Sequence, residues 1–358
     1  MSDLGKVYES SAAFAQTDIW TDSFTVQDHV YGLEHGSVGI TSSPTWVSDM
    51  LNEELEELTP VIRRLIRENP SMNEQEILWK LTLDLAAERS KIMRPLFDRE
   101  GPSKGRFSVQ VPIYEYRNAE RMVEAALQVH ALAPNMQVKI PSTTAGLAAI
   151  EEAIYRGVSV MATSCVSVSQ AIEVGEAVER ALNRRVQEGL PIDQIHPVVA
   201  LLLGVQDEWL SAYADKSGIC LDPDACNWAG VAVAKKTYKI YQEKGYRTRI
   251  LIAWYRNLHH WKEFIGGDLI MTIPAGWQKR YACMDLEIRD YMSDPVDPEI
   301  LRWLNKLEPF RRGYEEGALK VEDFETFEPV ICVLRRFIEV YQRAVFQVRD
   351  IMIPDPKK

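Results

Sequence analysis

The chain has 358 residues, of which 46% are hydrophobic, so it is long enough to bury a large core. Its 41 basic residues against 52 acidic ones leave a net charge of −11, which argues against nucleic acid or an anionic membrane as a partner. No apolar run approaches the length of a membrane span, the first residues do not resemble a secretion signal, and five scattered cysteines suit a reducing compartment, so we expect a cytoplasmic protein.

From the amino end, hydrophobic periodicity and turn residues predict strands that alternate with helices. Residues 1–16 are expected to form a loose or helical arm, and Pro44 favours a turn after the second strand. The predicted strands are Asp18–Phe24, Ser37–Thr41, Phe107–Val111, Gln137–Ile140, Val158–Thr163, Val198–Gly204, Arg249–Trp254 and Leu269–Ile273. The predicted helices are Gln27–His35, the helical stretch from Trp46 to about Asp98, Asn118–Ala133, Ala145–Arg156, Ser167–Arg185, helices up to Gly245, Arg256–Ile265 and Phe327–Arg349.

About eight strands separated by helices are typical of parallel β/α units, and eight such units close into a TIM barrel. We therefore predict an α/β fold, a TIM (β/α)8 barrel with additional helices, as a single domain over residues 1–358. The stretch 46–98 is expected to be a helical insertion, and 278–353 a set of carboxyl-terminal helices. The active site of such a barrel lies at the carboxyl ends of its strands.

Lys139 stands between Val138 and Ile140 in a short apolar strand. A lysine is rarely buried without compensation, and one form of compensation is chemical. Burial lowers the pKa of the amine, whose neutral form attacks a carbonyl to make a Schiff base. The alternative is an edge-strand lysine whose ammonium reaches water at the end of its alkyl chain, and the strand by itself favours this second interpretation.

Polar residues near the strand ends are the candidates for a site at the barrel mouth. In chain order they are Asp22, Ser43, Gln110, Lys139, Thr163 and Arg256. Period-two alternation directs Asp22 inward together with Trp20, and Lys139 inward together with Gln137. Four of these residues also have an ordinary structural alternative: a capping or turn carboxylate for Asp22, a hydrogen-bonded core side chain for Gln110 and Thr163, and an ion pair with a surface acid for Arg256.

Several segments around these positions are similar, in the same order, to those of the transaldolase family. They are I-W-T-D-S-F (19–24), G-I-T-S-S-P-T (39–45), V-K-I-P-S-T-T-A-G-L-A-A-I (138–150), G-V-S-V-M-A-T-S (157–164), A-W-Y-R-N (253–257) and, in the tail, F-E-T-F-E-P-V-I-C-V-L-R-R-F-I (324–338). The resemblance implies a TIM barrel on which Lys139 forms a Schiff base with a ketose and Asp22 is the general base for C–C cleavage. It also implies that Thr163 helps to hold a water molecule, and that no metal or organic cofactor is needed.

Three positions depart from the pattern of most transaldolases where the donor would bind. Gln110, in F-S-V-Q-V, stands where most members have a glutamate, and glutamine cannot carry a proton although it can position water. Met161 and Ser43 each stand where those members have an asparagine. The fructose 6-phosphate aldolase subgroup resembles this chain at Gln110 and Met161, so the resemblance also allows an aldolase that releases a free ketone such as dihydroxyacetone.

The segment that would bind a substrate phosphate is altered more strongly. Val205 stands where family members have an arginine, and Trp254 replaces the serine of A-S-F-R-N, while Arg256 is retained. A clamp of arginines on a phosphate has thus lost one partner. We expect a less charged or larger substrate tail, unless a cation elsewhere, such as Lys279 or Arg280, rebuilds the site.

The sequence therefore predicts a transaldolase or class I aldolase whose partners are a ketose donor and an aldehyde acceptor, phosphorylated or not, and it leaves a homo-oligomer open. The departures also permit a catalytically inactive barrel with a binding role. An interaction role for the aromatic-rich carboxyl-terminal helices is a third alternative, although such residues more often pack against a barrel. The chain has no phosphate-binding glycine motif and no H-E-x-x-H, and the adjacent His259 and His260 face different ways, so neither a nucleotide cofactor nor a metal is expected.

Overall fold

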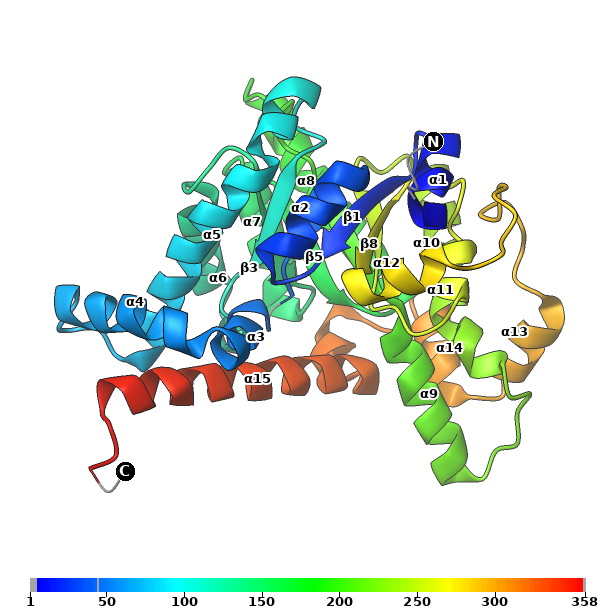
Figure 1. The fold of residues 1–358 in the computed structure, drawn as a ribbon. Coiled ribbons are helices and arrows are strands. Elements are labelled where there is room, and N and C mark those ends of the chain that lie inside the picture. The colour runs from blue at the N-terminus through cyan, green and yellow to red at the C-terminus, as the bar shows by residue number, and fades with distance from the viewer. Residues whose placement is uncertain (1–4, 44, 357–358) are drawn as a thin grey trace.

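The computed structural model describes residues 5–43 and 45–356, and its strands form one closed barrel in the order β1 to β8 (Figure 1). The strands are β1 Asp18–Asp22, β2 Gly39–Thr41, β3 Arg106–Gln110, β4 Met136–Pro141, β5 Val160–Cys165, β6 Val198–Leu202, β7 Arg249–Ala253 and β8 Ile270–Pro274. All neighbours pair in parallel, and β1 closes the barrel against β8, where Asp18 lies beside Ile270. The predicted TIM barrel is confirmed.

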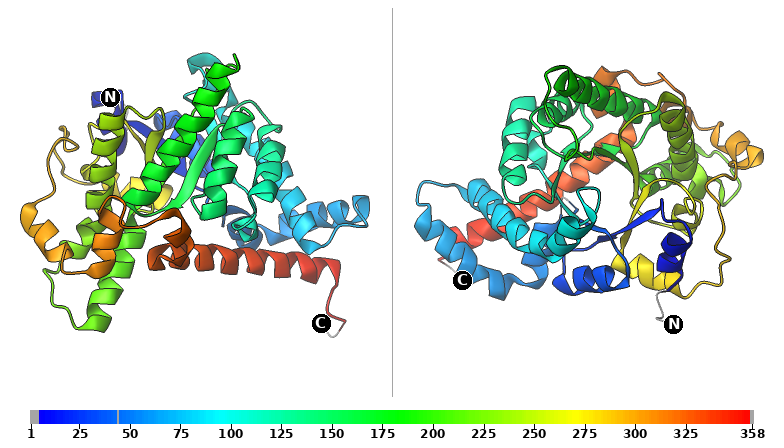
Figure 2. Two further views of the ribbon diagram at one scale, coloured as in Figure 1. Left: turned by 180° about the vertical axis from the view of Figure 1, so that it is seen from behind. Right: turned by 90° about the horizontal axis from the view of Figure 1, so that it is seen from above.

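Helices connect the strands and surround the barrel, as the view from above shows (Figure 2, right). They are α1 Gly5–Ala13, α2 Val26–His35, α3 Trp46–Glu53, α4 Leu55–Glu68, α5 Glu74–Glu100, α6 Ala119–His130, α7 Thr144–Tyr155, α8 Val168–Gln187, α9 Leu203–Ser217, α10 Ala229–Lys244, α11 His259–Lys262, α12 Ala275–Ala282, α13 Pro298–Leu304, α14 Glu308–Tyr314 and α15 Glu328–Met352. Short 3-10 turns cover Ile113–Glu115, Ala225–Trp228 and Val321–Thr326. None of the helices in the described ranges is long and apolar enough to cross a membrane.

The inside of the barrel is a packed apolar core below the mouth. Its buried side chains are Trp20, Met161, Val198, Ala200, Leu251 and Ile270. Parallel strands in register direct paired residues to the same side of the sheet, so Lys139 of β4 is flanked by Gln110 of β3 and Met161 of β5. The residues that follow this core along the strands therefore form the floor of the mouth.

Several predicted elements are shorter in the structure; β1, for example, ends at Asp22 and not at Phe24, and two of the differences lie close to the mouth of the barrel. The strand predicted over Val198–Gly204 stops at Leu202, because α9 begins directly at Leu203. The Gly204 N–H donates to the Trp254 carbonyl oxygen at 3.0 Å, and a Cβ at Gly204 would lie 2.6 Å from that oxygen, so only glycine fits this crossing. The helix predicted over Arg256–Ile265 is reduced to the four residues of α11.

The last helix takes a path that positions it over the site. Figure 1 shows α15 running beneath the barrel, and it contacts α3, α4, α5 and α9 as well as β5. The helical stretch predicted at 46–98 consists of α3, α4 and α5, and α5 extends to Glu100 and packs against β3. α15 and α3 therefore cover the face of the barrel at which the carboxyl ends of its strands lie.

Candidate active site

A cavity of about 180 Å³ lies at the carboxyl ends of the barrel strands. Its lining includes Asp22, Ser43, Lys139, Thr163, Trp254 and Arg256. Asp22 ends β1, Lys139 and Thr163 lie near the ends of β4 and β5, and the others follow β2 and β7. Strand ends that are distant in the chain thus converge on one mouth, as the topology of the barrel requires.

The Lys139 amine is buried at the floor of this cavity. The residue is 8% exposed, and its Nζ donates a hydrogen bond to the Ser42 carbonyl oxygen at 3.0 Å. Burial lowers the pKa of the Lys139 amine because it penalises the charged form, and the nearby Asp22 carboxylate opposes that shift. A closed barrel has no edge strand from which this lysine could reach water, so its environment favours a neutral, nucleophilic amine.

Asp22 faces the cavity from β1. Burial raises the pKa of the Asp22 carboxyl, while the charge of Lys139 and a hydrogen bond from Thr41 oppose the rise. The Thr41 hydroxyl is in turn bonded to the Thr272 hydroxyl at 2.6 Å, which joins β2 to β8 beside the aspartate. Among the described residues no ion pair joins Asp22 to Lys139, so the two groups interact across a space that a ligand can enter.

The end of β5 is irregular where it carries Thr163. Its backbone oxygen accepts a hydrogen bond from the Ser142 N–H at 2.7 Å, and Thr163 pairs with Pro141 in the sheet register. The register of β5 against β6 shifts between Ala162 and Cys165, and Ser164 has a φ of 55°, a left-handed conformation that non-glycine residues rarely adopt. Such strain persists only where the surrounding structure enforces it, and here it fixes the residue that follows Thr163.

Residues 19–311 match the sequence model of the transaldolase/fructose-6-phosphate aldolase family. The chain belongs to this family. Transaldolase 2 of Streptomyces coelicolor is 31% identical over 171 residues, which are 47% of this chain and 46% of that protein. Transaldolase 2 of Streptomyces avermitilis is 30% identical over 170 residues (47% and 46%), and the transaldolase of Mycobacterium tuberculosis 27% over 165 residues (46% and 44%). The matched segments thus span about half the length of these curated relatives.

Two residues that distinguish this chain from most transaldolases lie outside the lining of the cavity. Gln110 is the register partner of Lys139, yet it lines a separate space of about 40 Å³ between α3 and α15. Neither amide atom of Gln110 has a hydrogen-bond partner within the described part of the chain. Met161 is buried in the barrel core, one layer below Thr163. The catalytic role of Gln110 and the substrate contact of Met161 stay predictions.

Ser43, which stands where most transaldolases have an asparagine, lines the cavity and connects it to α3. Its hydroxyl is bonded to the Thr45 hydroxyl at 2.7 Å, and Thr45 donates to Asp49 Oδ2 at 2.8 Å. Burial raises the pKa of the Asp49 carboxyl, against the effect of this hydrogen bond. The turn predicted at Pro44 falls outside the described residues.

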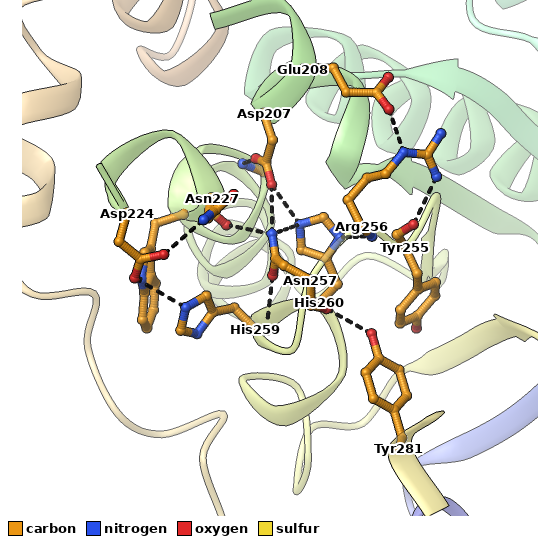
Figure 3. A network of polar contacts seen from close by, with 12 residues as sticks. Asp207, Glu208, Asp224, Asn227, Tyr255, Arg256, Asn257, His259, His260 and Tyr281 are labelled. Atoms are coloured by element: carbon orange, nitrogen blue, oxygen red, sulfur yellow. Dashed lines mark hydrogen bonds and ion pairs between the residues drawn. The ribbon is translucent and has the colours of Figure 1, made fainter. Parts of the chain in front are cut away.

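A network of polar contacts holds Arg256 at the exit of β7 (Figure 3). Its Nε forms an ion pair with Glu208 of α9, and its Nη1 donates to the Tyr255 carbonyl oxygen at 2.8 Å. The Arg256 backbone N–H donates to His260 Nδ1 at 3.0 Å, so Nε2 carries the imidazole proton and donates to Asp207 at 2.7 Å. Arg256 is therefore fixed by partners of the chain itself on both its backbone and its side chain.

The other two cations considered from the sequence do not reach the cavity. Lys279 and Arg280 lie on α12, outside the residues that line it, and the guanidinium of Arg280 lies over the Trp277 ring at 4.7 Å. Besides Lys139 and Arg256, the mouth is lined by the cation Arg336 of α15, together with Phe337. The rule that places sites at strand ends cannot find these two, because they reach the mouth from the last helix.

Three further residues that line the cavity, Thr41, Tyr255 and Thr272, could have been predicted from the sequence. Thr41 and Thr272 alternate with apolar residues on short strands, and Tyr255 lies between the two family positions of A-W-Y-R-N. Period-two alternation applied to every strand would have found the threonines. Within the described ranges no three histidine, cysteine, aspartate or glutamate side chains are grouped so that they could hold a metal ion.

Proposed function

We propose that this protein is a transaldolase-like enzyme that cleaves and forms a C–C bond of a ketose through a Schiff base on Lys139. One observation carries the proposal. Lys139 and Asp22 face the same cavity at the carboxyl end of a family barrel, and burial shifts the pKa of each toward its neutral form. A neutral amine is the species that attacks a carbonyl, and a carboxylate of raised pKa is a better proton acceptor than an ordinary one.

In the first step the Lys139 amine attacks the C2 carbonyl carbon of the ketose, and loss of water with uptake of a proton leaves an iminium ion. Asp22 then accepts the proton of the C4 hydroxyl, the electrons of the C3–C4 bond move into the iminium to give an enamine, and an aldehyde departs. The enamine carbon attacks an acceptor aldehyde, and Asp22 returns its proton to the new alkoxide. Water finally hydrolyses the second iminium and restores the amine.

The remaining site residues are proposed to bind and orient. Thr163 lies beside the lysine strand and would hold the water that enters and leaves the iminium, with Gln110 as a second, non-ionising partner. Ser43 would contact the three-carbon donor unit. Trp254 and Arg256 line the end of the cavity where the substrate tail extends, and we propose that this end departs from the phosphate pocket of most relatives, since Val205 supplies no charge.

An aldolase that releases free ketone is the second candidate, and Gln110 is the observation that favours it. An amide at this position cannot shuttle a proton to water. Other groups must then decide whether the three-carbon unit is transferred to an acceptor or released as free ketone. The two activities differ in their need for an acceptor. A transferase turns over only when an aldehyde is supplied, whereas an aldolase forms free dihydroxyacetone from the ketose alone.

Borohydride reduction in the presence of dihydroxyacetone tests the proposal. We expect a stable adduct on Lys139 by peptide mass spectrometry, and none on Lys139→Ala. Lys235 provides an internal control, because it is also buried but its Nζ is bonded to Glu263 at 2.9 Å and to two carbonyl oxygens. Absence of an adduct at Lys139 with any ketose or ketone tested would instead support a non-catalytic barrel.

A further inference from the structure

The position of the family arginine, Val205, lies on an apolar cavity that adjoins the active site. This second cavity has a volume of about 190 Å³ and lies between α9 and α15. Its apolar lining includes Val205, Trp209, Ala212 and Val333. Trp254 and Arg336 line both this space, here called the tail cavity, and the cavity that holds Lys139, so the two spaces share these side chains as a wall.

The arginine retained from the family segment already faces an acid of the chain. Arg256 is ion-paired with Glu208, which also lines the tail cavity. Arg336 forms no ion pair within the described ranges, and its guanidinium lies over the Trp254 ring at 4.9 Å. A phosphate dianion bound at Arg256 would meet the Glu208 carboxylate and would have to displace it to gain a bidentate arginine.

Trp254 forms the wall between the two cavities and is held in an unusual conformation. Its φ is 66°, and the guanidinium groups of Arg256 and Arg336 lie 5.3 Å and 4.9 Å from the centre of its ring, with the Phe337 ring at 5.9 Å. Its Nε1 is buried and has no hydrogen-bond partner among the described residues, so one neutral donor is left for a ligand oxygen. The faces offered to a ligand are thus aromatic and guanidinium planes, which stack on aromatic groups.

We infer that the tail cavity binds an uncharged, apolar or aromatic tail of the acceptor aldehyde, in place of the phosphate of a sugar phosphate. An apolar cavity of about 150 Å³ is large enough to hold a benzene ring, so a cavity of about 190 Å³ accommodates a phenyl group. Arg336 is exposed and lines both cavities, so a change of its rotamer would join them. The inference rests on the Schiff-base chemistry proposed above and identifies the tail of its substrate.

A comparison of acceptors tests the inference. With dihydroxyacetone as donor, kcat/KM is measured for phenylacetaldehyde, glycolaldehyde and glyceraldehyde 3-phosphate. We expect phenylacetaldehyde to exceed glyceraldehyde 3-phosphate by at least about tenfold, the factor that one added apolar group of this size supplies in a fitted pocket. A preference for the phosphorylated aldehyde would overturn the inference.

A variant that fills the tail cavity tests tail binding separately from the reaction at Lys139. Cys332 is exposed on α15 and lines the tail cavity, so Cys332→Trp adds bulk there with little demand on folding. The variant should lower the ratio of phenylacetaldehyde to glycolaldehyde kcat/KM about tenfold. Ile331→Trp, one residue away on the exposed side of the same helix, is the matched control and should leave this ratio unchanged.

Removal of the Arg256–Glu208 ion pair should shift the acceptor preference in the opposite direction, toward a phosphorylated aldehyde. Glu208→Gln frees the Arg256 guanidinium from its ion pair, so glyceraldehyde 3-phosphate should improve several-fold relative to phenylacetaldehyde. An equal effect of Cys332→Trp on both short and aromatic aldehydes, or no effect of Glu208→Gln on the phosphate ester, contradicts the inference while the Lys139 adduct persists. Loss of the borohydride adduct in the unmodified protein would overturn the Schiff-base proposal itself, and the tail inference with it.

Discussion

The chemistry proposed for Lys139 and Asp22 has the same cause in both residues, which is removal of the side chain from water. Burial acts on both groups in the direction of their neutral forms, and each charge partly offsets the effect on the other. Their separation matters as much as their proximity, because a direct ion pair would hold the amine protonated and occupy the carboxylate. The Ser42 carbonyl, 3.0 Å from Nζ, instead positions the amine while leaving its attack on a ligand free.

Substitution of the carboxylate should separate cleavage from Schiff-base formation. In Asp22→Asn the amide cannot accept the C4 hydroxyl proton, so we expect kcat for ketose cleavage to fall by about 10²–10⁴-fold. The borohydride adduct of dihydroxyacetone on Lys139 should still form, because that step needs the amine alone. Asp193→Asn, an exposed aspartate before β6, is the control for both assays. A variant that retains cleavage would remove Asp22 from the proposed role.

The strand-end residues of the site could be predicted from the sequence, but not their individual surroundings. Period-two alternation and barrel topology place Asp22, Lys139 and Thr163 at one mouth, and the structure brings them together. Gln110 satisfies the same rule and yet lines a different space under α15. The side of a strand that a residue faces follows from the local sequence. The side chains that it contacts there belong to helices that are far away in the chain.

At the scale of elements, α15 lines the candidate active-site cavity and is not only an addition to the outside of the barrel. It crosses from α9 to α4 and places Arg336 and Phe337 over the mouth (Figure 1). Of the aromatic residues predicted to pack against the barrel, Phe324, Phe327 and Phe337 are buried and Tyr341 is half-buried, whereas Phe346 is 55% exposed. Its route could not be predicted, because an amphipathic helix reveals that it packs but not on which surface.

Truncation of a wall residue on α15 should affect both stability and substrate binding. Phe337 is 5% exposed, so Phe337→Ala should lower the free energy of unfolding by about 3–5 kcal/mol and raise KM, since the lost ring bounds the cavity. Phe346→Ala on the same helix, where the side chain is 55% exposed, should cost no more than about 0.5 kcal/mol. Urea unfolding and steady-state kinetics of the two variants measure the difference. Equal losses would contradict the position of α15.

Over the whole molecule, the two ends of the barrel have different tasks. At the amino end, the buried Asp18 of β1 forms ion pairs with Lys104 and Arg249. The buried guanidinium of Arg106 donates to four backbone carbonyl oxygens there, and burial lowers its pKa to about 10. These two charged groups are held by partners within the protein, although Gln137 Oε1 and Thr248 Oγ1 at this end have no hydrogen-bond partner among the described residues. At the carboxyl end, the amide of Gln110 and the indole of Trp254 also keep unpartnered polar atoms in the described part of the chain, and burial of polar groups without partners costs stability.

That cost predicts that the catalytic pair destabilises the fold. In Asp22→Asn/Lys139→Met two buried ionisable groups are replaced by neutral ones of similar size, so the free energy of unfolding at pH 7 should rise by about 1–4 kcal/mol while activity is lost. The pH dependence has a definite sign. In the native state the pKa of Asp22 is raised above 3.8, so the native state binds the Asp22 proton more tightly than the unfolded state. The unmodified protein therefore loses stability as the pH rises from 3.8 to the raised pKa.

Lys139 changes the stability in the opposite direction, at higher pH. Its native pKa lies below 10.5, so between that lowered value and 10.5 the unfolded state binds more protons, and the unmodified protein regains stability as pH rises. The advantage of the double variant should therefore grow as pH increases from 3.8, be largest at intermediate pH and shrink toward 10.5. Urea unfolding of both proteins from pH 4.5 to 10 measures this curve. A double variant that is less stable at every pH would mean that the pair supports the fold, and that burial does not drive the shifts on which the chemistry depends.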